Sequence, residues 1–254
     1  MKITIFTSNS IRHHSLINRI SKLGHKCFAV IEKNKLSNGS NKSILNKRYF
    51  KKVIKSEKKI FKDKSLSKKK IIFLYTQWGK INYLKKNKLK DFLNSDLYIV
   101  FGSSYIKGWL VNYLIKKKAI NIHMGISPYY KGAACNFWAV YDNNPHFVGA
   151  TIHYLSKGID SGKILFHVLP SIKCKSDFDF TMRSALSAQK ALISKIKNKS
   201  IFKLKSYSQD KKKLIRYSKI EDFNSSIIEK YSKKKSFTSP QYNKKFYINP
   251  YFET

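Results

Sequence analysis

Compact apolar runs of strand length alternate with runs of helical spacing over the first 125 residues of the chain. The apolar runs predict strands over Lys2–Phe6, Cys27–Ile31, Ile71–Tyr75, Leu97–Phe101 and Ala119–His123. The periodic runs predict helices over Ile11–Leu23, Ile81–Leu93 and Tyr105–Lys117, with a further helix around residues 43–54 that a basic loop follows. Strands that alternate with helices are typical of a parallel sheet covered on both faces. We therefore expect an α/β, three-layer, Rossmann-like fold.

The pattern changes after residue 125. Two strand-like runs, Val148–Leu155 and Lys163–Leu169, are separated only by the loop SKGIDSG. A connection this short joins antiparallel neighbours, so we expect a mostly parallel sheet that turns mixed after the strand ending at His123. Asp177–Lys197 then has the pattern of a long helix that packs back on the sheet.

Composition divides the chain near residue 198. Residues 1–198 carry the regular apolar patterning and form the predicted main domain, whereas residues 199–254 are polar and basic and form a predicted short C-terminal extension. A run of about 18 apolar residues is missing, so no membrane span is expected, and MKITIFTSNS at the N-terminus indicates a first strand and not a signal peptide. The three cysteines lack metal-ligand spacing. They fit free thiols in a reducing cytoplasm, which is the expected location, with no metal bound.

The chain carries a formal net charge of +38. Such an excess fits binding to a polyanion, because Lys and Arg neutralise phosphates and release counterions. Only five of the 52 basic residues are Arg, however, and direct readout and phosphate forks favour Arg over Lys. Residues with A/T-rich codons dominate the composition. Mutational bias and selected polyanion binding both stay open, and nucleic-acid binding is expected only through nonspecific charge.

Polar residues end one of the predicted buried strands. Asn121 and His123 lie two apart at the carboxyl end of Ala119–His123, so their side chains point to the same side of the sheet. Ligand sites of open α/β sheets form at such strand ends. Taken alone, the pair favours a structural histidine over a site.

Three further motifs accompany this pair. GISPYYKG follows at 125–132, GIDSG at 158–162, and FGSSYIKGW precedes it at 101–109. With NIH at 121–123, these motifs resemble those of the folate-dependent formyltransferases, whose core carries a strand ending in N-x-H, a GxxPxYRG loop and a later GxDxG loop. The resemblance covers about 70 residues, from Asp96 to Leu165. It implies the formyltransferase fold and an N-formyltransferase that uses 10-formyltetrahydrofolate as co-substrate.

The resemblance places the catalytic trio at Asn121, His123 and Asp160. The Asn121 amide would donate a hydrogen bond to the formyl oxygen as negative charge builds there. His123 would donate from an imidazolium and shuttle a proton between the attacking and leaving nitrogens. Asp160 would favour protonated His123, fix its orientation and hold a relay water. This chemistry requires neither a metal nor a covalent intermediate.

The resemblance also implies where the ligands would lie. Folate would contact, largely through backbone groups, the residues Phe101, Gly102, Ser103, Ser104, Leu155, Gly158 and Ile159. The acceptor would lie against Ser8, Asn9, Ser10, Arg12 and Lys131. Lys131 stands where the family usually has Arg, which weakens bidentate binding of an anion. His153 and His167 fall in predicted strands and are expected to be structural.

The acceptor amine is not fixed by these motifs. Relatives acting on glycinamide ribotide usually carry a glycine-bearing phosphate loop after the first strand, and FTSNSIRHHS at residues 6–15 has no glycine. Relatives acting on methionyl-tRNA carry a longer C-terminal domain than residues 199–254 supply. Enzymes that formylate amino sugars attached to nucleotides have short, varied extensions. We therefore expect an amino-sugar nucleotide first, glycinamide ribotide second and methionyl-tRNA third. A non-catalytic basic polyanion-binding protein on the same scaffold stays as the alternative, and the oligomeric state is not predicted.

Overall fold

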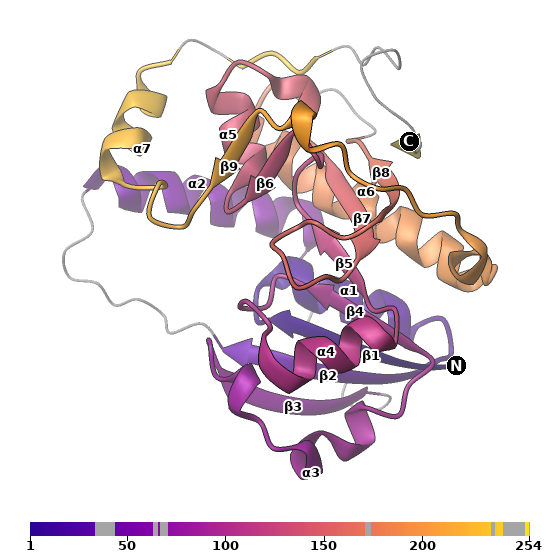
Figure 1. The fold of residues 1–254 in the computed structure, drawn as a ribbon. Coiled ribbons are helices and arrows are strands. Elements are labelled where there is room, and N and C mark those ends of the chain that lie inside the picture. Colours follow the sequence, from indigo (N-terminus) through magenta and orange to yellow (C-terminus); the bar gives the residue numbers. More distant parts are fainter. Residues whose placement is uncertain are drawn as a thin grey trace.

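A computed structural model describes residues 1–33, 44–62, 66, 71–170, 174–234, 237–240 and 252–253. Its main sheet has eight strands (Figure 1). Their order is β10 (Phe252–Glu253), β8 (Ile164–Val168), β7 (Ala150–Tyr154), β5 (Ile120–His123), β4 (Leu97–Phe101), β1 (Lys2–Ser8), β2 (Lys26–Lys33) and β3 (Ile71–Gln77). Strands β1 to β5 pair in parallel with one another, and β10 pairs in parallel with β8. β7 is antiparallel to both β5 and β8, so the sheet turns mixed directly after β5, as predicted.

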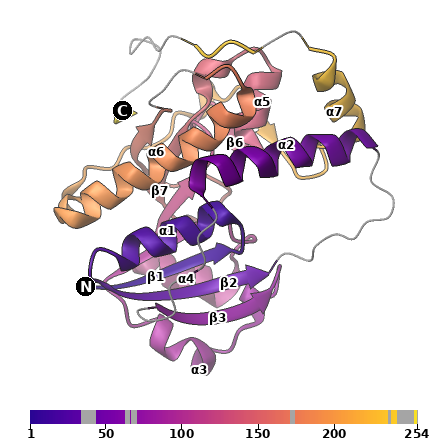
Figure 2. The same ribbon diagram turned by 180° about the vertical axis from the view of Figure 1, so that it is seen from behind.

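Helices cover both faces of this sheet. α1 (Ile11–Ser21), α2 (Ile44–Phe61) and α6 (Asp177–Lys197) lie on the side seen in Figure 2, and α4 (Gly108–Lys116) and the short α3 (Lys86–Leu89) lie on the other side. The alternation of side chains along β1 produces the two cores. Ile3 and Ile5 pack with apolar side chains of α1 and α6, whereas Phe6 packs with those of α4. The expected three-layer α/β fold is confirmed.

The segment predicted as one helix over Ile81–Leu93 is broken, so this prediction was wrong. It consists of two 3₁₀ turns, Ile81–Tyr83 and Lys90–Phe92, on either side of α3. The side chain of Asn82 binds the backbone of the loop between β4 and α4: it donates to Tyr105 O at 2.8 Å and accepts from Lys107 N at 2.8 Å.

Other boundaries differ by less. α4 begins at Gly108 and not at Tyr105, and α2 continues to Phe61, past the expected end near residue 54. Residue 43 and most of the expected basic loop, residues 63–65 and 67–70, lie outside the described residues.

The second half of the chain builds a smaller layer beside β5. It contains β6 (Tyr130–Gly132), α5 (Cys135–Tyr141), β9 (Arg216–Ser218), α7 (Ser225–Ser232) and 3₁₀ turns at Pro145–Phe147 and Lys211–Lys213. A further 3₁₀ turn, Ser200–Lys203, follows α6 and packs into the main core through Ile201. β9 pairs in parallel with β6, so the chain after α6 returns to the loop that follows β5 (Figure 1). A third apolar core, centred on Trp138 and Tyr130, lies beneath this layer. None of the described helices combines the length and apolarity that crossing a membrane requires.

Candidate active site

The carboxyl ends of β1, β4 and β5 meet at one edge of the main sheet (Figure 1). Asn121 and His123 occupy the end of β5. The loop between β7 and β8 carries Asp160 to within 3.2 Å of His123. The structure therefore brings together the three side chains predicted as the catalytic trio.

Asp160 is the centre of this cluster. Its Oδ2 lies 3.2 Å from Nδ1 of His123 and accepts a hydrogen bond from the backbone N–H of Gly132 at 3.0 Å. Its Oδ1 lies 3.4 Å from Nδ2 of Asn121 and 3.8 Å from Nε2 of His153. Burial opposes the charge of the carboxylate, but the two histidines and the Gly132 N–H outweigh burial and lower the pKa of Asp160 to about 2. Asp160 is therefore an anion near neutral pH.

His123 is held at both ring nitrogens by the protein. Nε2 lies 3.1 Å from the carbonyl oxygen of Tyr130, which can only accept, so Nε2 carries a proton. A second proton on Nδ1 would point at Asp160. Burial has the largest effect and holds the pKa of His123 below its usual value, although the Asp160 carboxylate opposes that shift. Because both ring nitrogens have protein partners, His123 acts on the reaction cavity through its contact with Asp160.

His153 belongs to the same cluster. It is the cross-strand partner of Asn121 in the antiparallel β5–β7 pair, so both side chains lie on one face of the sheet. Nδ1 of His153 donates to the Tyr154 carbonyl at 2.8 Å, which leaves Nε2 to accept from Nδ2 of Asn121 at 3.0 Å. His153 therefore orients the Asn121 amide. We expected His153 to be structural, and its place in the sequence gave no sign of the pairing register.

A cavity of about 820 Å³, which we call the reaction cavity, opens over Asn121, His153 and Asp160. Nine further residues predicted for ligand binding line it: Ser8, Ser10, Arg12, Gly102, Ser103, Ser104, Leu155, Gly158 and Ile159.

Four predicted site residues lie elsewhere. Phe101 is buried and packs edge-on against His13, with ring centroids 4.6 Å apart. Asn9 is exposed between β1 and α1. Lys131 lies on β6, where burial lowers its pKa. His123 lines a neighbouring cavity and meets the reaction cavity through Asp160.

A family model described as formyl transferase matches residues 1–196, which is most of the chain. The chain belongs to the formyl transferase family. No curated protein sequence matches it.

Solved structures of formyltransferases share this fold at low sequence identity. A sugar N-formyltransferase from a Shewanella species is 15% identical with a TM-score of 0.54, over 88% of this chain and 78% of that one. A 4-N formyltransferase from Francisella tularensis is 19% identical with a TM-score of 0.53, over 87% and 77%. Glycinamide ribonucleotide transformylase 1 from Symbiobacterium toebii is 14% identical with a TM-score of 0.55, over 83% and 94%. At such identities the likeness shows the fold.

Two buried glutamates fix the loops around the reaction cavity of this formyl transferase. Glu32, at the end of β2, accepts from the backbone N–H and the hydroxyl of Ser104 at 2.6 and 2.8 Å. Glu57 of α2 accepts from the backbone N–H and guanidinium of Arg12 at 3.0 and 2.9 Å. The loop after β4 and the start of α1 are therefore positioned by carboxylates from neighbouring elements. The Glu57 carboxylate also neutralises part of the Arg12 charge.

The chain after α6 supplies a wall of the reaction cavity that the sequence analysis did not assign. Its lining residues run without interruption from Tyr217 to Glu221. The only hint in the sequence was the isolated aromatics of this basic segment. Within the described ranges of this formyl transferase, no group of three His, Cys, Asp or Glu side chains is placed to hold a metal ion.

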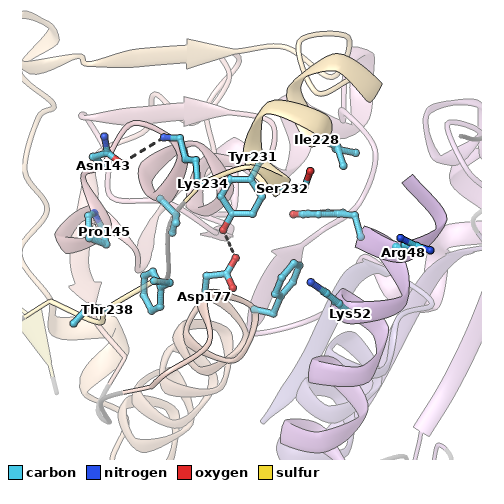
Figure 3. A pocket seen from close by; sticks show the side chains of 14 residues that line it. Arg48, Lys52, Asn143, Pro145, Asp177, Ile228, Tyr231, Ser232, Lys234 and Thr238 are labelled. Atoms are coloured by element: carbon cyan, nitrogen blue, oxygen red, sulfur yellow. Dashed lines mark hydrogen bonds between the residues drawn. The ribbon is translucent and has the colours of Figure 1, made fainter. Parts of the chain in front are cut away.

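Two further cavities continue from the reaction cavity. The first, of about 450 Å³, is lined by His123 and by aromatic side chains of α2, α5 and α7, and we call it the aromatic cavity. It shares Arg12, Gly132 and Ala134 with the reaction cavity. The second, of about 900 Å³, shares Tyr49 and Tyr231 with the aromatic cavity, and we call it the outer cavity (Figure 3).

Basic side chains surround the outer cavity. Arg48 and Lys52 reach it from α2, and Lys234 reaches it from beyond α7, where it bonds Asn143 (Figure 3). One carboxylate is present, that of Asp177, which accepts from the Tyr231 hydroxyl. Burial raises the pKa of Asp177, and the hydrogen bond from Tyr231 opposes this rise. The three cations outnumber this carboxylate, so the outer cavity favours an anion.

Proposed function

We propose that this formyl transferase moves a formyl group from 10-formyltetrahydrofolate to the primary amine of an amino sugar linked to a nucleotide. One observation carries the proposal. Asp160 lies 3.2 Å from His123 and 3.4 Å from Asn121, and this cluster stands between two walls of the reaction cavity, one made of residues predicted to bind folate and one of residues predicted to bind the acceptor. Such a cluster between two ligand walls is the arrangement that group transfer between two bound molecules requires.

The reaction cavity has the chemistry to hold the formyl donor. Its mouth is lined by large apolar side chains that are substantially exposed, namely Trp78, Tyr105, Ile159, Tyr217 and Ile220. Exposed apolar side chains gathered at one cavity indicate a ligand surface. The backbone of Gly102–Ser104 and the 155–160 loop would supply polar contacts to a flat heteroaromatic ring. When bound there, the donor supplies an electrophilic formyl carbon beside Asn121.

Each residue of the trio has a distinct role in this proposal. Nδ2 of Asn121 would give up its long 3.4 Å contact with Asp160 and donate a hydrogen bond to the formyl oxygen instead, while it keeps its contact with His153. The carboxylate of Asp160 would accept the proton of the attacking amine directly or through a water. The same proton would then pass from Asp160 to the leaving nitrogen, which regenerates the carboxylate, and His123, whose Nδ1 lies 3.2 Å from Oδ2, would orient that carboxylate and stabilise its charge.

The chain of cavities supports a nucleotide-linked acceptor. The aromatic cavity adjoins the trio at His123 and Gly132, and its walls include the rings of Tyr49, Phe178 and Tyr231. In a sugar nucleotide the diphosphate joins the sugar to the base, so it would lie between them, beside Arg48 and Lys52 of the outer cavity. The base would stack on the same three rings where they line the outer cavity. The three cavities thus match an amine, a diphosphate and a base on one extended substrate.

The other acceptors fit less well. Glycinamide ribotide is the second candidate, because a glycinamide ribonucleotide transformylase shares the fold, but it is a smaller molecule with one phosphate, and the β1–α1 turn carries no glycine. Methionyl-tRNA ranks third. Names of structural neighbours that include sugar N-formyltransferases agree with the first candidate.

Nucleotide binding tests the acceptor half of this proposal. Titration with UDP and dTDP in moderate salt is expected to show saturable binding, weakened about tenfold or more by the double variant Arg48→Ala/Lys52→Ala. Lys47→Ala/Lys51→Ala is the matched control, since it removes the same charge from exposed positions of the same helix. Equal weakening by both double variants would mean that only nonspecific charge holds the nucleotide.

Donor binding is tested separately with a nonreactive analogue of 10-formyltetrahydrofolate, by calorimetry or fluorescence, on the wild type and His123→Ala. Micromolar binding by the wild type is expected. Failure of the folded wild type to bind the analogue would overturn the donor assignment.

A further inference from the structure

We propose that the segment between α6 and α7 completes the active site, and that Gln209 in this segment positions Asp160. The proposal rests on the catalytic role of Asp160 described above. It concerns residues beyond the family match, which ends at residue 196. It assigns a function to a part of the chain that the sequence analysis described only as a basic extension.

Gln209 binds the backbone of the Asp160 loop with one nitrogen. Its Nε2 donates to the carbonyl oxygens of Asp160 and Gly162 at 2.8 and 2.7 Å. An oxygen in this place would face two carbonyl oxygens, so the orientation of the amide is fixed by its partners. Directly upstream, Tyr207 exchanges two backbone hydrogen bonds of 2.8 Å with Ile164, which holds the segment beside the start of β8.

The Asp160 loop needs such a contact because its backbone is strained. Asp160 has a φ of +45°, in the left-handed region, which costs a non-glycine residue about 1 kcal/mol or more. A residue stays in that region only where surrounding contacts determine it. Gln209 binds the carbonyl of this very residue, and the backbone angles of Asp160 set the direction of its carboxylate toward His123 and Asn121.

The same segment holds the other side of the carboxylate. Ser218 of β9 accepts from the N–H of Ala133 at 2.8 Å and donates its hydroxyl to the Ala133 carbonyl at 2.6 Å. Next to it, Gly132 donates its N–H to Asp160 at 3.0 Å. Gln209 and Ser218 therefore fix the Asp160 backbone and the Gly132 donor from a single stretch of chain.

Gln209→Met tests the positioning role, because Met keeps the length of the side chain and removes both hydrogen bonds. The pKa of His123, followed by NMR titration of its imidazole, reports the Asp160 carboxylate without any substrate. Removal of that carboxylate in Asp160→Asn lowers the pKa of His123 and sets the scale. The pKa in Gln209→Met is expected between those of the wild type and Asp160→Asn. A value equal to that of the wild type would overturn the proposal.

Kinetics give the second readout. With an acceptor in hand, Gln209→Met is expected to lower kcat about tenfold or more, with a much smaller change in the KM of either substrate, because the reacting groups are misplaced and not lost. Gln77→Met, at an exposed position of β3, is the matched control, and melting temperatures exclude general unfolding. A shifted His123 pKa without any formyl transfer by the wild type would retain the positioning role and reject the proposed function. Formyl transfer by the wild type together with unchanged kinetics in Gln209→Met would retain the proposed function and reject the positioning role.

Discussion

Gly132→Ala separates backbone strain from contact with the C-terminal segment. Gly132 has a φ of +93°, and an added Cβ would lie 2.0 Å from the carbonyl oxygen of Ser218. Because such contacts essentially never fall below 3.0 Å, β9 must move by at least 1 Å, the difference between these distances. That shift would stretch the 2.8 Å bond from Ala133 N to Ser218 O beyond bonding range.

The cost can be worked from these contacts. A left-handed Ala costs about 1 kcal/mol, and two lost hydrogen bonds between Ala133 and Ser218 add about 1 kcal/mol each. We therefore expect Gly132→Ala to lower the free energy of unfolding by about 3 kcal/mol. Gly24→Ala is the matched control, since Gly24 has a φ of +80° with no atom within 4 Å of the added Cβ, and it is expected to cost only about 1 kcal/mol.

Urea unfolding followed by circular dichroism measures both variants. Gly132→Ala should also weaken binding of the formyl-donor analogue, because β9 leads into a wall of the reaction cavity, whereas Gly24→Ala should not. Equal destabilisation by the two substitutions, with donor binding intact in both, would refute the claim that β9 packs closely on Gly132 and Ala133.

Further outcomes follow from individual contacts. Asp160→Asn should destabilise the fold by about 2 kcal/mol at pH 7, since the pKa near 2 lies below 3.8; this difference should hold above about pH 4 and shrink in urea titrations as the pH falls toward 2. Asn121→Ala should lower kcat by at least about a hundredfold in a formyl-transfer assay, and near-full activity would exclude its role at the formyl oxygen. Arg216→Ala removes a bidentate pair with Asp142 at 2.7 and 2.8 Å and should cost about 2 kcal/mol in thermal unfolding. Gel-shift binding of nucleic acid should vanish between low and moderate salt, and salt-resistant binding would revive the polyanion-binding alternative.

Regular elements were predictable because their side chains bury at fixed periods. The helix Asp177–Lys197 has the predicted bounds, and each strand from β1 to β5 forms where its apolar run stands. The mixed end of the sheet followed from the short loop between β7 and β8. The helix predicted over Ile81–Leu93 was wrong, because the tertiary contacts of Asn82 outweigh local periodicity.

The site was predictable only where a motif carried it. Asn121, His123 and Asp160 belong to the recognised motifs and do lie together. His153 enters through strand register, and Gln209 through a contact 49 residues away from Asp160, and neither relation leaves a local pattern. Charge alone could not show that Arg12 pairs with Glu57, 45 residues later.

Transfer of the formyl group itself tests the central claim most directly. The wild type and His123→Ala are incubated with 10-formyltetrahydrofolate and, one at a time, 4-amino-sugar nucleotides and glycinamide ribotide, and the acceptors are analysed by mass spectrometry. The proposal predicts that the wild type adds one formyl group to an amino-sugar nucleotide and that His123→Ala forms the product at least about a hundredfold more slowly. Formylation of glycinamide ribotide alone would contradict the proposed acceptor. If folded protein that binds the donor analogue formylates none of these amines, the proposed amino-sugar activity is contradicted.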